Sequence, residues 1–289
     1  MHNKLAIMDK YNQLNYLKYQ ILTSISNAKF FCKTLLKLGD LPDFYIIGVQ
    51  KSGTSSLYEC LCKHPGIIHR LNKEVHFFNN PSNRNHGINF YKANFSTKYN
   101  KRKVERQIGY TPLEGDATPF FIHPCVPELV YEVTPNAKLI LIVRNPIDRA
   151  LSHYHHNQIR GRENVSFAEA VKLEEDRITN DFNKLLKNPE HSANAFLTYS
   201  YCKRGYYDEQ MENWLNFFPQ ENLNIINFDD FVINQANVCA KIFNFLNLPI
   251  YQITSIQKTN SGKYTEKIDP NLYDQLFDNF FITMNVYLK

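Results

Sequence analysis

Apolar residues gather in three short runs along the chain. The run FYII at 44–47 ends at Gly48, the run AKLILIV at 137–143 ends at Arg144, and LNIINF occupies 223–228. Each run is short enough for a buried strand, and the nearly continuous apolar character of the first two is typical of a parallel sheet covered on both faces. We therefore expect three central strands.

Segments with helical spacing alternate with these runs. Apolar residues recur at three- and four-residue steps from Thr54, from about Ile147, and over 238–249, where Pro249 ends the pattern. Ser166 followed by Glu169 is a capping box that starts a further helix. This alternation predicts an α/β fold, with a central, mostly parallel sheet, helices on both faces, and ligands at the carboxyl ends of the strands.

The first 40 residues form a separate pattern. Apolar residues recur at mostly helical steps over 8–38, and Gly39, Asp40 and Pro42 end the segment. We expect residues 1–40 to be an N-terminal helical segment that packs against a single domain at 41–289. The alternative is an arm that joins two copies in a homodimer.

Composition narrows the class of partner. The 289 residues are 43% hydrophobic and 14% aromatic, which is enough for one large core. The net charge of +5 comes from charges of both signs spread along the chain. A small anionic ligand fits this distribution better than a nucleic acid, which needs a dense basic stripe.

Cysteine usage and hydropathy favour a protein of a reducing compartment. The six cysteines are scattered and show neither a CxxC pair nor the spacing of a zinc site, so we expect no metal. No stretch approaches the roughly 20 apolar residues that span a bilayer. The sequence therefore predicts a cytoplasmic protein without a membrane span.

The loop after the first run has the composition of an anion site. GVQKSGTS at 48–55 joins a strand to a helix, so backbone N–H groups converge with Lys51 at the start of that helix. In the nucleoside triphosphate loop GxxxxGK[ST] the lysine follows the second glycine, whereas Lys51 precedes Gly53. A phosphate or sulfate is therefore expected here, but not the site of an ordinary kinase or GTPase.

A second anion site is expected at the end of the second run. Arg144 leaves the strand and Ser152 lies two turns into the following helix, so a guanidinium and a hydroxyl can share one anion. Two anion sites at neighbouring strand ends predict a nucleotide with phosphates at two positions.

These motifs together resemble those of a known family. GVQKSGTSSL, followed about 90 residues later by LIVRNPIDRALSHY, is similar to the paired motifs of sulfotransferases that use 3′-phosphoadenosine 5′-phosphosulfate. NKEVHFFN resembles the Lys-Glu-x-His-Phe-Phe segment of the heparan-sulfate-type carbohydrate sulfotransferases, and further blocks follow in order to about residue 285. The resemblance implies the sulfotransferase fold, with its phosphate-binding strand, loop and helix, and no required metal.

The resemblance also implies roles for individual residues. Glu74 matches the general base, His76 lies beside it, and Lys51 should face the bridging oxygen of the donor. The expected contacts of the nucleotide are Lys51, Ser52, Gly53, Thr54 and Ser55 at the 5′-phosphosulfate, Arg144 and Ser152 at the 3′-phosphate, and Gly262 and Lys263 in a late loop.

Sulfuryl transfer independently requires such residues. A fixed lysine and loop amides can stabilise the charge that develops on the leaving phosphate. The acceptor must lose a proton, and a carboxylate takes it best when burial raises its pKa. Val75, Phe77 and Phe78 surround Glu74 in the sequence, so we expect its pKa to be raised.

One block departs from the heparan-type pattern and bears on the acceptor. Where many of those enzymes have Glu-Lys-Thr-Pro, this chain has Asp116, Ala117, Thr118 and Pro119, with Glu114 just before. The lost positive charge favours a small, neutral or cationic natural product, with Glu114, Asp116 and Thr118 as acceptor contacts. The alternatives are a carbohydrate or glycosaminoglycan O-sulfotransferase and a non-catalytic module that binds a nucleotide or glycan.

Overall fold

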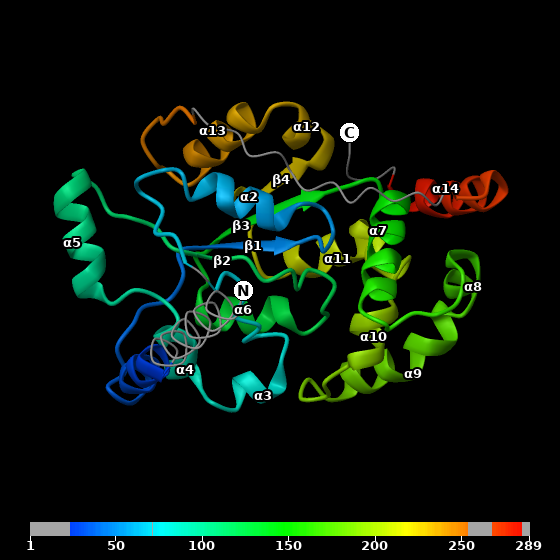
Figure 1. The fold of residues 1–289 in the computed structure, drawn as a ribbon, viewed down its shortest axis with the longest axis horizontal. Coiled ribbons are helices and arrows are strands. Elements are labelled where there is room, and N and C mark those ends of the chain that lie inside the picture. Colours follow the sequence, from blue (N-terminus) through cyan, green and yellow to red (C-terminus); the bar gives the residue numbers. More distant parts are fainter. Residues whose placement is uncertain (1–23, 71, 254–267, 285–289) are drawn as a thin grey trace, which may run out of the picture.

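Four parallel strands form the central sheet of the computed structural model, which describes residues 24–70, 72–253 and 268–284 (Figure 1). The strands lie in the order β2-β1-β3-β4. Their bounds are β1 (Phe44–Gly48), β2 (Gly115–Asp116), β3 (Lys138–Val143) and β4 (Leu223–Asn227). The three expected strands are β1, β3 and β4. The two-residue β2 was not foreseen, because it has no apolar run.

The register brings the strand ends to one edge. Phe44 of β1 pairs with both Gly115 and Lys138, and Leu139 of β3 pairs with Leu223. All three pairings are parallel, so the loops that follow β1 and β3 leave the sheet side by side. This is the edge at which ligands bind in open α/β sheets.

Helices cover both faces of the sheet, which confirms the predicted fold class. Tyr45 and Ile47 pack into one core with Trp214 of α11, whereas Phe44 and Ile46 pack into another. The helices are α2 (Thr54–Leu61), α3 (Pro81–Arg84), α4 (Ile88–Ala93), α5 (Lys98–Ile108), α6 (Val126–Val133), α7 (Pro146–Ile159), α8 (Phe167–Lys172), α9 (Glu174–Lys187), α10 (Asn194–Tyr199), α11 (Tyr207–Leu215), α12 (Phe228–Ile233), α13 (Gln235–Phe245) and α14 (Pro270–Met284), with short 3₁₀ turns η1 (Lys203–Gly205) and η2 (Gln220–Asn222).

Part of the N-terminal segment is helical, over residues 24–35. Lys33 Nζ donates to the backbone oxygens of Ala93 and Phe95 at 2.6 and 2.5 Å, and the Phe30 and Phe90 rings pack edge to face. This stretch therefore contacts α4. Residues 1–23 lie outside the described part, and the boundary at residue 40 and the dimer arm stay predictions.

The cysteines are free thiols, and Cys60 and Cys239 meet in the core with their sulfurs 2.9 Å apart. In the described ranges no group of His, Cys, Asp and Glu residues is placed to hold a metal ion. The helices in those ranges are also too short or too polar to cross a bilayer.

Candidate active site

The loop between β1 and α2 has the backbone that its glycine predicts. Gly53 adopts the left-handed conformation with φ 83°, and a β-carbon added there would lie 3.0 Å from the ring of Phe228. Both the conformation and the space therefore require glycine. The turn ends in the first residues of α2, whose amides from Thr54 to Ser56 have no partner within the helix.

Lys51 lies in this turn and is half-buried. Burial lowers the pKa of its ammonium group, and the nearby positive charges of Arg160 and Arg144 lower it further. The charged form of Lys51 is therefore destabilised at this point unless an anion binds beside it. With the amides of α2, Lys51 forms a site suited to phosphate or sulfate.

Arg144 lies just before α7, and Ser152 lies within this helix. Asn145 caps this helix by accepting from the N–H groups of Ile147 and Asp148 at 2.9 and 3.2 Å, and Pro146 occupies its first position. Arg144 Nη1 donates to the backbone oxygen of Lys51 at 3.2 Å. The strand-end arginine is thereby tied to the anion loop.

Glu74 lies in a charged cluster that the sequence did not suggest. Its Oε1 accepts from Lys73 Nζ at 2.5 Å, and its Oε2 lies 3.4 Å from His76 Nε2. The hydrogen bond with His76, supported by Lys73, lowers the pKa of Glu74 to about 2 against the opposing effect of burial. The expected increase in this pKa is therefore wrong. The same bond raises the pKa of His76.

Lys73 also joins Glu74 to the loop between β1 and α2, and sequence reasoning missed it. Its Nζ donates to Ser55 Oγ at 2.6 Å as well as to Glu74. The only local signal was its place directly before Glu74 in NKEVHFFN, and that place does not show that its side chain turns to Ser55.

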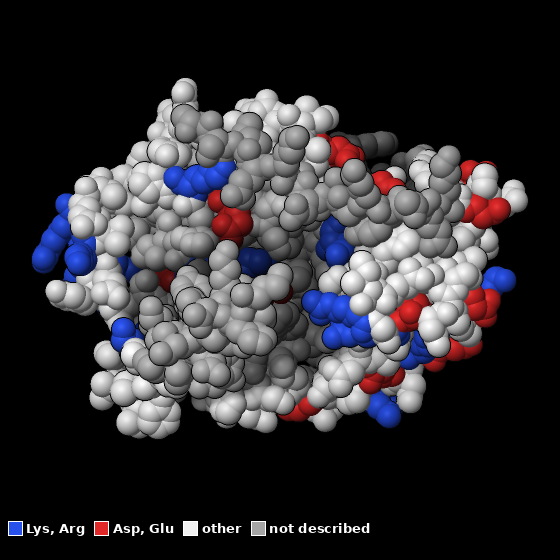
Figure 2. Space-filling model, viewed as in Figure 1, with Lys and Arg blue, Asp and Glu red and all other residues white. Residues whose placement is uncertain are grey.

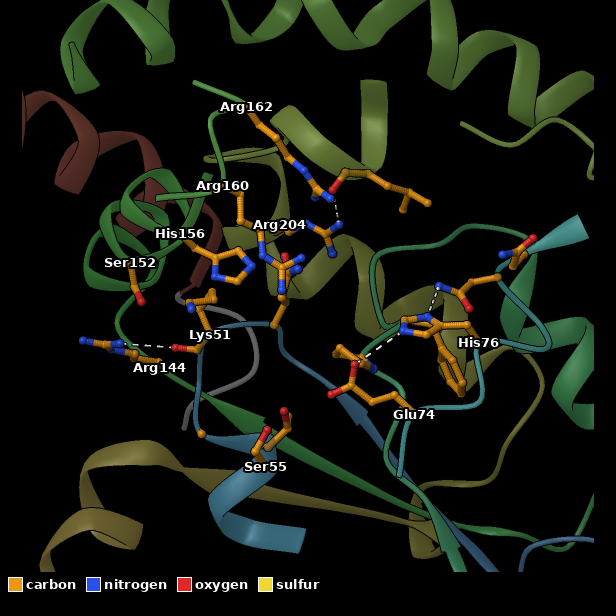
Figure 3. Close-up of a pocket in the computed structure, with 18 of the residues that line it drawn as sticks. Lys51, Ser55, Glu74, His76, Arg144, Ser152, His156, Arg160, Arg162 and Arg204 are labelled. Atoms are coloured by element: carbon orange, nitrogen blue, oxygen red, sulfur yellow. Dashed lines mark hydrogen bonds and ion pairs between the residues drawn. The ribbon is translucent and has the colours of Figure 1, made fainter. Parts of the chain in front are cut away.

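One cavity of 1230 Å³ collects most of the predicted site (Figure 3). The predicted residues that line it are Lys51, Gly53, Thr54, Ser55, Glu74, His76, Arg144 and Ser152. Ser52 is fully buried and does not line it. Gly262 and Lys263 lie outside the described residues. The roles assigned to all these residues stay predictions.

The acidic block does not face the cavity. Glu114, Asp116 and Thr118 are almost completely buried, and none lines the cavity. Glu114 Oε2 accepts from the Ser96 N–H at 2.8 Å, and its Oε1 lies 3.6 Å from Arg70 Nε. Side chains buried in this way do not fit the predicted contacts with the acceptor, so we discard those contacts. The sequence shows the charges but not their burial.

Asp116 and Thr118 instead support the segment that carries Glu74. Asp116 accepts from the hydroxyls of Tyr91 and Thr118 at 2.9 and 2.6 Å. Thr118 Oγ1 in turn accepts from the N–H groups of Val75 and His76 at 3.0 and 3.3 Å. His76 has a left-handed backbone with φ 52°, which such bonds help to hold. These two residues therefore hold the segment that carries Glu74.

We expect Thr118→Val to destabilise the protein by about 1 to 3 kcal/mol, because it leaves the N–H groups of Val75 and His76 without their acceptor and removes one hydrogen bond from the buried Asp116 carboxylate. It should also slow turnover, because the Glu74 segment loses its anchor. Denaturant unfolding and steady-state kinetics measure the two effects. Thr179→Val removes an exposed hydroxyl bond to Glu175 and should change neither, so equal behaviour of the two variants would contradict the assignment.

The sequence also missed the basic wall of the cavity. Arg160, Arg162, Arg204 and His156 line it together with Lys51 and Arg144. Figure 2 shows Lys and Arg side chains bordering the hollow on this face. Glu74 is the only carboxylate among the described lining residues, so the cavity attracts anions.

Comparison with known proteins agrees with this geometry. The human heparan sulfate glucosamine 3-O-sulfotransferase 5 is 30% identical over 210 residues, which are 72% of this chain and 54% of that protein. The membrane-associated sulfotransferase kil1 of Dictyostelium discoideum is 29% identical over 280 residues, covering 73% and 57%. This chain thus spans about half the length of these relatives.

A solved structure is also similar. The crystal structure of a sulfotransferase from Alicyclobacillus acidocaldarius matches with a TM-score of 0.60 and 27% identity, over 84% of this chain and 93% of that one.

The relatives correct the predicted location. One of them is membrane-associated by name, and others are named for heparan sulfate. They contradict the prediction of a cytoplasmic protein, which rested on scattered cysteines and the lack of an apolar stretch. Neither the cysteine pattern nor the hydropathy indicates the compartment in which a protein acts.

The family model described as a sulfotransferase domain matches residues 41–281. This range includes every described residue that lines the cavity. The chain therefore belongs to the sulfotransferase family, as its motifs predicted.

Proposed function

We propose that this protein transfers a sulfuryl group from 3′-phosphoadenosine 5′-phosphosulfate, the donor substrate, to a hydroxyl or amino group of a glycosaminoglycan-type carbohydrate. The observation that carries the proposal is that the anion loop, the strand-end arginine and Glu74 line one cavity. The family and the heparan sulfate names of several relatives support it.

The chain's own groups fit the two anionic ends of the donor. The amides of α2 and the half-buried Lys51 would hold the 5′-phosphosulfate, since they combine free donors with an uncompensated charge. Arg144 and Ser152, in the same cavity, would hold the 3′-phosphate. When bound, the donor supplies an activated sulfuryl group.

Transfer then needs a stabilised leaving group and a proton acceptor. Lys51 would lie against the oxygen that bridges phosphorus and sulfur and stabilise its charge as the sulfur–oxygen bond breaks. Glu74 would accept the proton of the attacking hydroxyl. Its low pKa keeps the carboxylate ionised but makes it a weaker base than the sequence predicted. The transfer is a single displacement, because acceptor and donor would meet in one cavity.

The small, cationic natural product proposed from the sequence is replaced by an anionic carbohydrate. The carboxylates on which that idea rested are buried elsewhere, and the cavity lining within the described ranges has five Lys and Arg residues against one carboxylate. An acceptor that carries sulfate or carboxylate groups complements this charge.

An acceptor screen tests the proposal. The protein is incubated with the donor and either heparan-type oligosaccharides or small neutral and cationic amines and alcohols. We expect the mass gain of one SO₃ group on the oligosaccharides. Transfer to the small cationic compounds alone would overturn the acceptor class. Donor binding without transfer to any acceptor would favour the non-catalytic module.

Adenosine 3′,5′-bisphosphate should stabilise the protein more than AMP does, because only the bisphosphate reaches Arg144 and Ser152. At about a hundred times its dissociation constant, the bisphosphate adds about 2.7 kcal/mol to the free energy of unfolding. Thermal unfolding with each ligand at equal concentration measures the difference. Equal shifts would remove the role assigned to these two residues.

A further inference from the structure

One face of α7 carries polar side chains along the whole cavity. Ser152, His156 and Arg160 are spaced by four residues, which places them on the same side of the helix, and all three line the cavity. At 1.5 Å per residue, Arg160 lies about 12 Å along the axis from Ser152. The backbone of Arg160 therefore lies well along the helix from Ser152, although its charge is near enough to Lys51 to lower the pKa of that lysine.

Arg162 lies two residues after Arg160, in the turn that ends α7. Gly161 has φ 65°, and the Arg162 N–H bonds back to the oxygen of Asn157 at 2.8 Å. The hydroxyl of Tyr199 donates to the Arg162 oxygen at 3.3 Å. The backbone of Arg162 is thus held while its exposed side chain lines the cavity.

No carboxylate of the described chain lies within 4.0 Å of either guanidinium. The neighbouring Glu163 is buried and bound instead by Arg177 at 2.6 Å and by the Tyr201 hydroxyl at 2.9 Å. After burial, the positive charges of Lys51, Arg160 and Arg162 lower the pKa of His156. Positive charge therefore extends from Lys51 along this wall without compensation.

The pair lies on another side of the cavity from the proposed base. In Figure 3, Arg160 and Arg162 come from the end of α7, whereas Glu74 and His76 lie across the cavity from them. An acceptor whose hydroxyl reaches Glu74 could thus present a neighbouring group to the two guanidinium groups. The helix dipole stabilises a positive charge at the C-terminus of a helix, and this would explain the presence of Arg160. It would not explain Arg162, because Arg162 lies beyond the helix.

We propose that Arg160 and Arg162 form a subsite for a sulfate or carboxylate group of the acceptor. The subsite rests on the proposed function, because it assigns the contacts of the same acceptor. Guanidinium groups bind both anions through paired, charge-assisted hydrogen bonds. The pair would thus select acceptors that already carry an anionic group near the position to be sulfated.

The test measures binding, so that it does not depend on turnover. N-sulfated heparan oligosaccharide and its desulfated, carboxyl-reduced counterpart are titrated into the full chain loaded with adenosine 3′,5′-bisphosphate. R160Q/R162Q should raise the dissociation constant of the anionic oligosaccharide at least about tenfold and change that of the neutral one little. Its affinity for the bisphosphate should fall far less than its affinity for the anionic oligosaccharide, and R160K/R162K should recover part of the loss.

The control is R102Q/R106Q, which removes the same charge from the exposed face of α5, away from the cavity. This variant should bind both oligosaccharides like the parent. Equal losses in the two double variants would show a general charge effect and overturn the subsite. A loss of bisphosphate affinity in R160Q/R162Q as large as its loss of oligosaccharide affinity would also overturn it. If the parent binds no anionic oligosaccharide, the subsite also fails. Selective binding without sulfation would instead keep the subsite and refute the proposed transfer.

Discussion

Replacing Glu74 with glutamine is expected to lower kcat by about 100-fold or more and to leave the affinity for adenosine 3′,5′-bisphosphate nearly unchanged. The amide has the same shape but cannot accept the acceptor's proton, and a lost general base typically costs this much. Steady-state kinetics at saturating donor and acceptor, together with titration of the bisphosphate, separate the two quantities.

The contacts of Glu74 make the substitution specific. The carboxylate accepts from Lys73, and Lys73 also binds Ser55 in the anion loop between β1 and α2. Removing the whole side chain of Glu74 would therefore disturb that loop as well. Glutamine keeps an oxygen for Lys73. Asp176→Asn, in the exposed first turn of α9 and outside the cavity, is the matched control and should be neutral. Normal turnover of Glu74→Gln would make His76, 3.4 Å away, the next candidate for the base.

Lys51→Ala should lower kcat by about 10²- to 10³-fold and also weaken binding of the bisphosphate. The ammonium group is the half-buried charge in the turn before α2, so its loss removes stabilisation of the leaving phosphate as well as of the bound nucleotide. Rapid-quench measurement of a single turnover, combined with titration, distinguishes chemistry from affinity.

Two further variants test whether charge explains that loss. Lys51→Arg keeps the positive charge and should recover part of the rate, whereas Lys241→Ala removes an exposed lysine of α13 and should behave like the parent. If Lys51→Ala raised KM for the donor while kcat stayed normal, Lys51 would contribute equally to ground-state and transition-state binding. Its assignment to the leaving group would then be wrong.

The predicted acceptor pocket shows that the charge of a residue can be misinterpreted when its surroundings in the fold are unknown. In the sequence, Glu114 and Asp116 indicated an acidic acceptor pocket. In the structure Asp116 bonds to Tyr91 and Thr118, and Glu114 bonds to Ser96 beside Arg70. Burial raises the pKa of both carboxyl groups. A sequence reports that a group can ionise, but only the fold reports whether the group meets solvent.

The amino-acid sequence alone predicted the strands β1, β3 and β4 and the helices α2, α7 and α13, because each pattern depends on residues a few positions apart. It also placed Lys51 and Arg144 at neighbouring strand ends, since parallel pairing brings those ends together. The tertiary structure decided the pKa of Glu74, because that value depends on where the side chains of Lys73 and His76 turn. It also decided the charge of the basic wall of the cavity, to which the end of α7 contributes Arg160 and Arg162 and η1 contributes Arg204. Such contacts between distant segments leave no periodic trace in a single sequence.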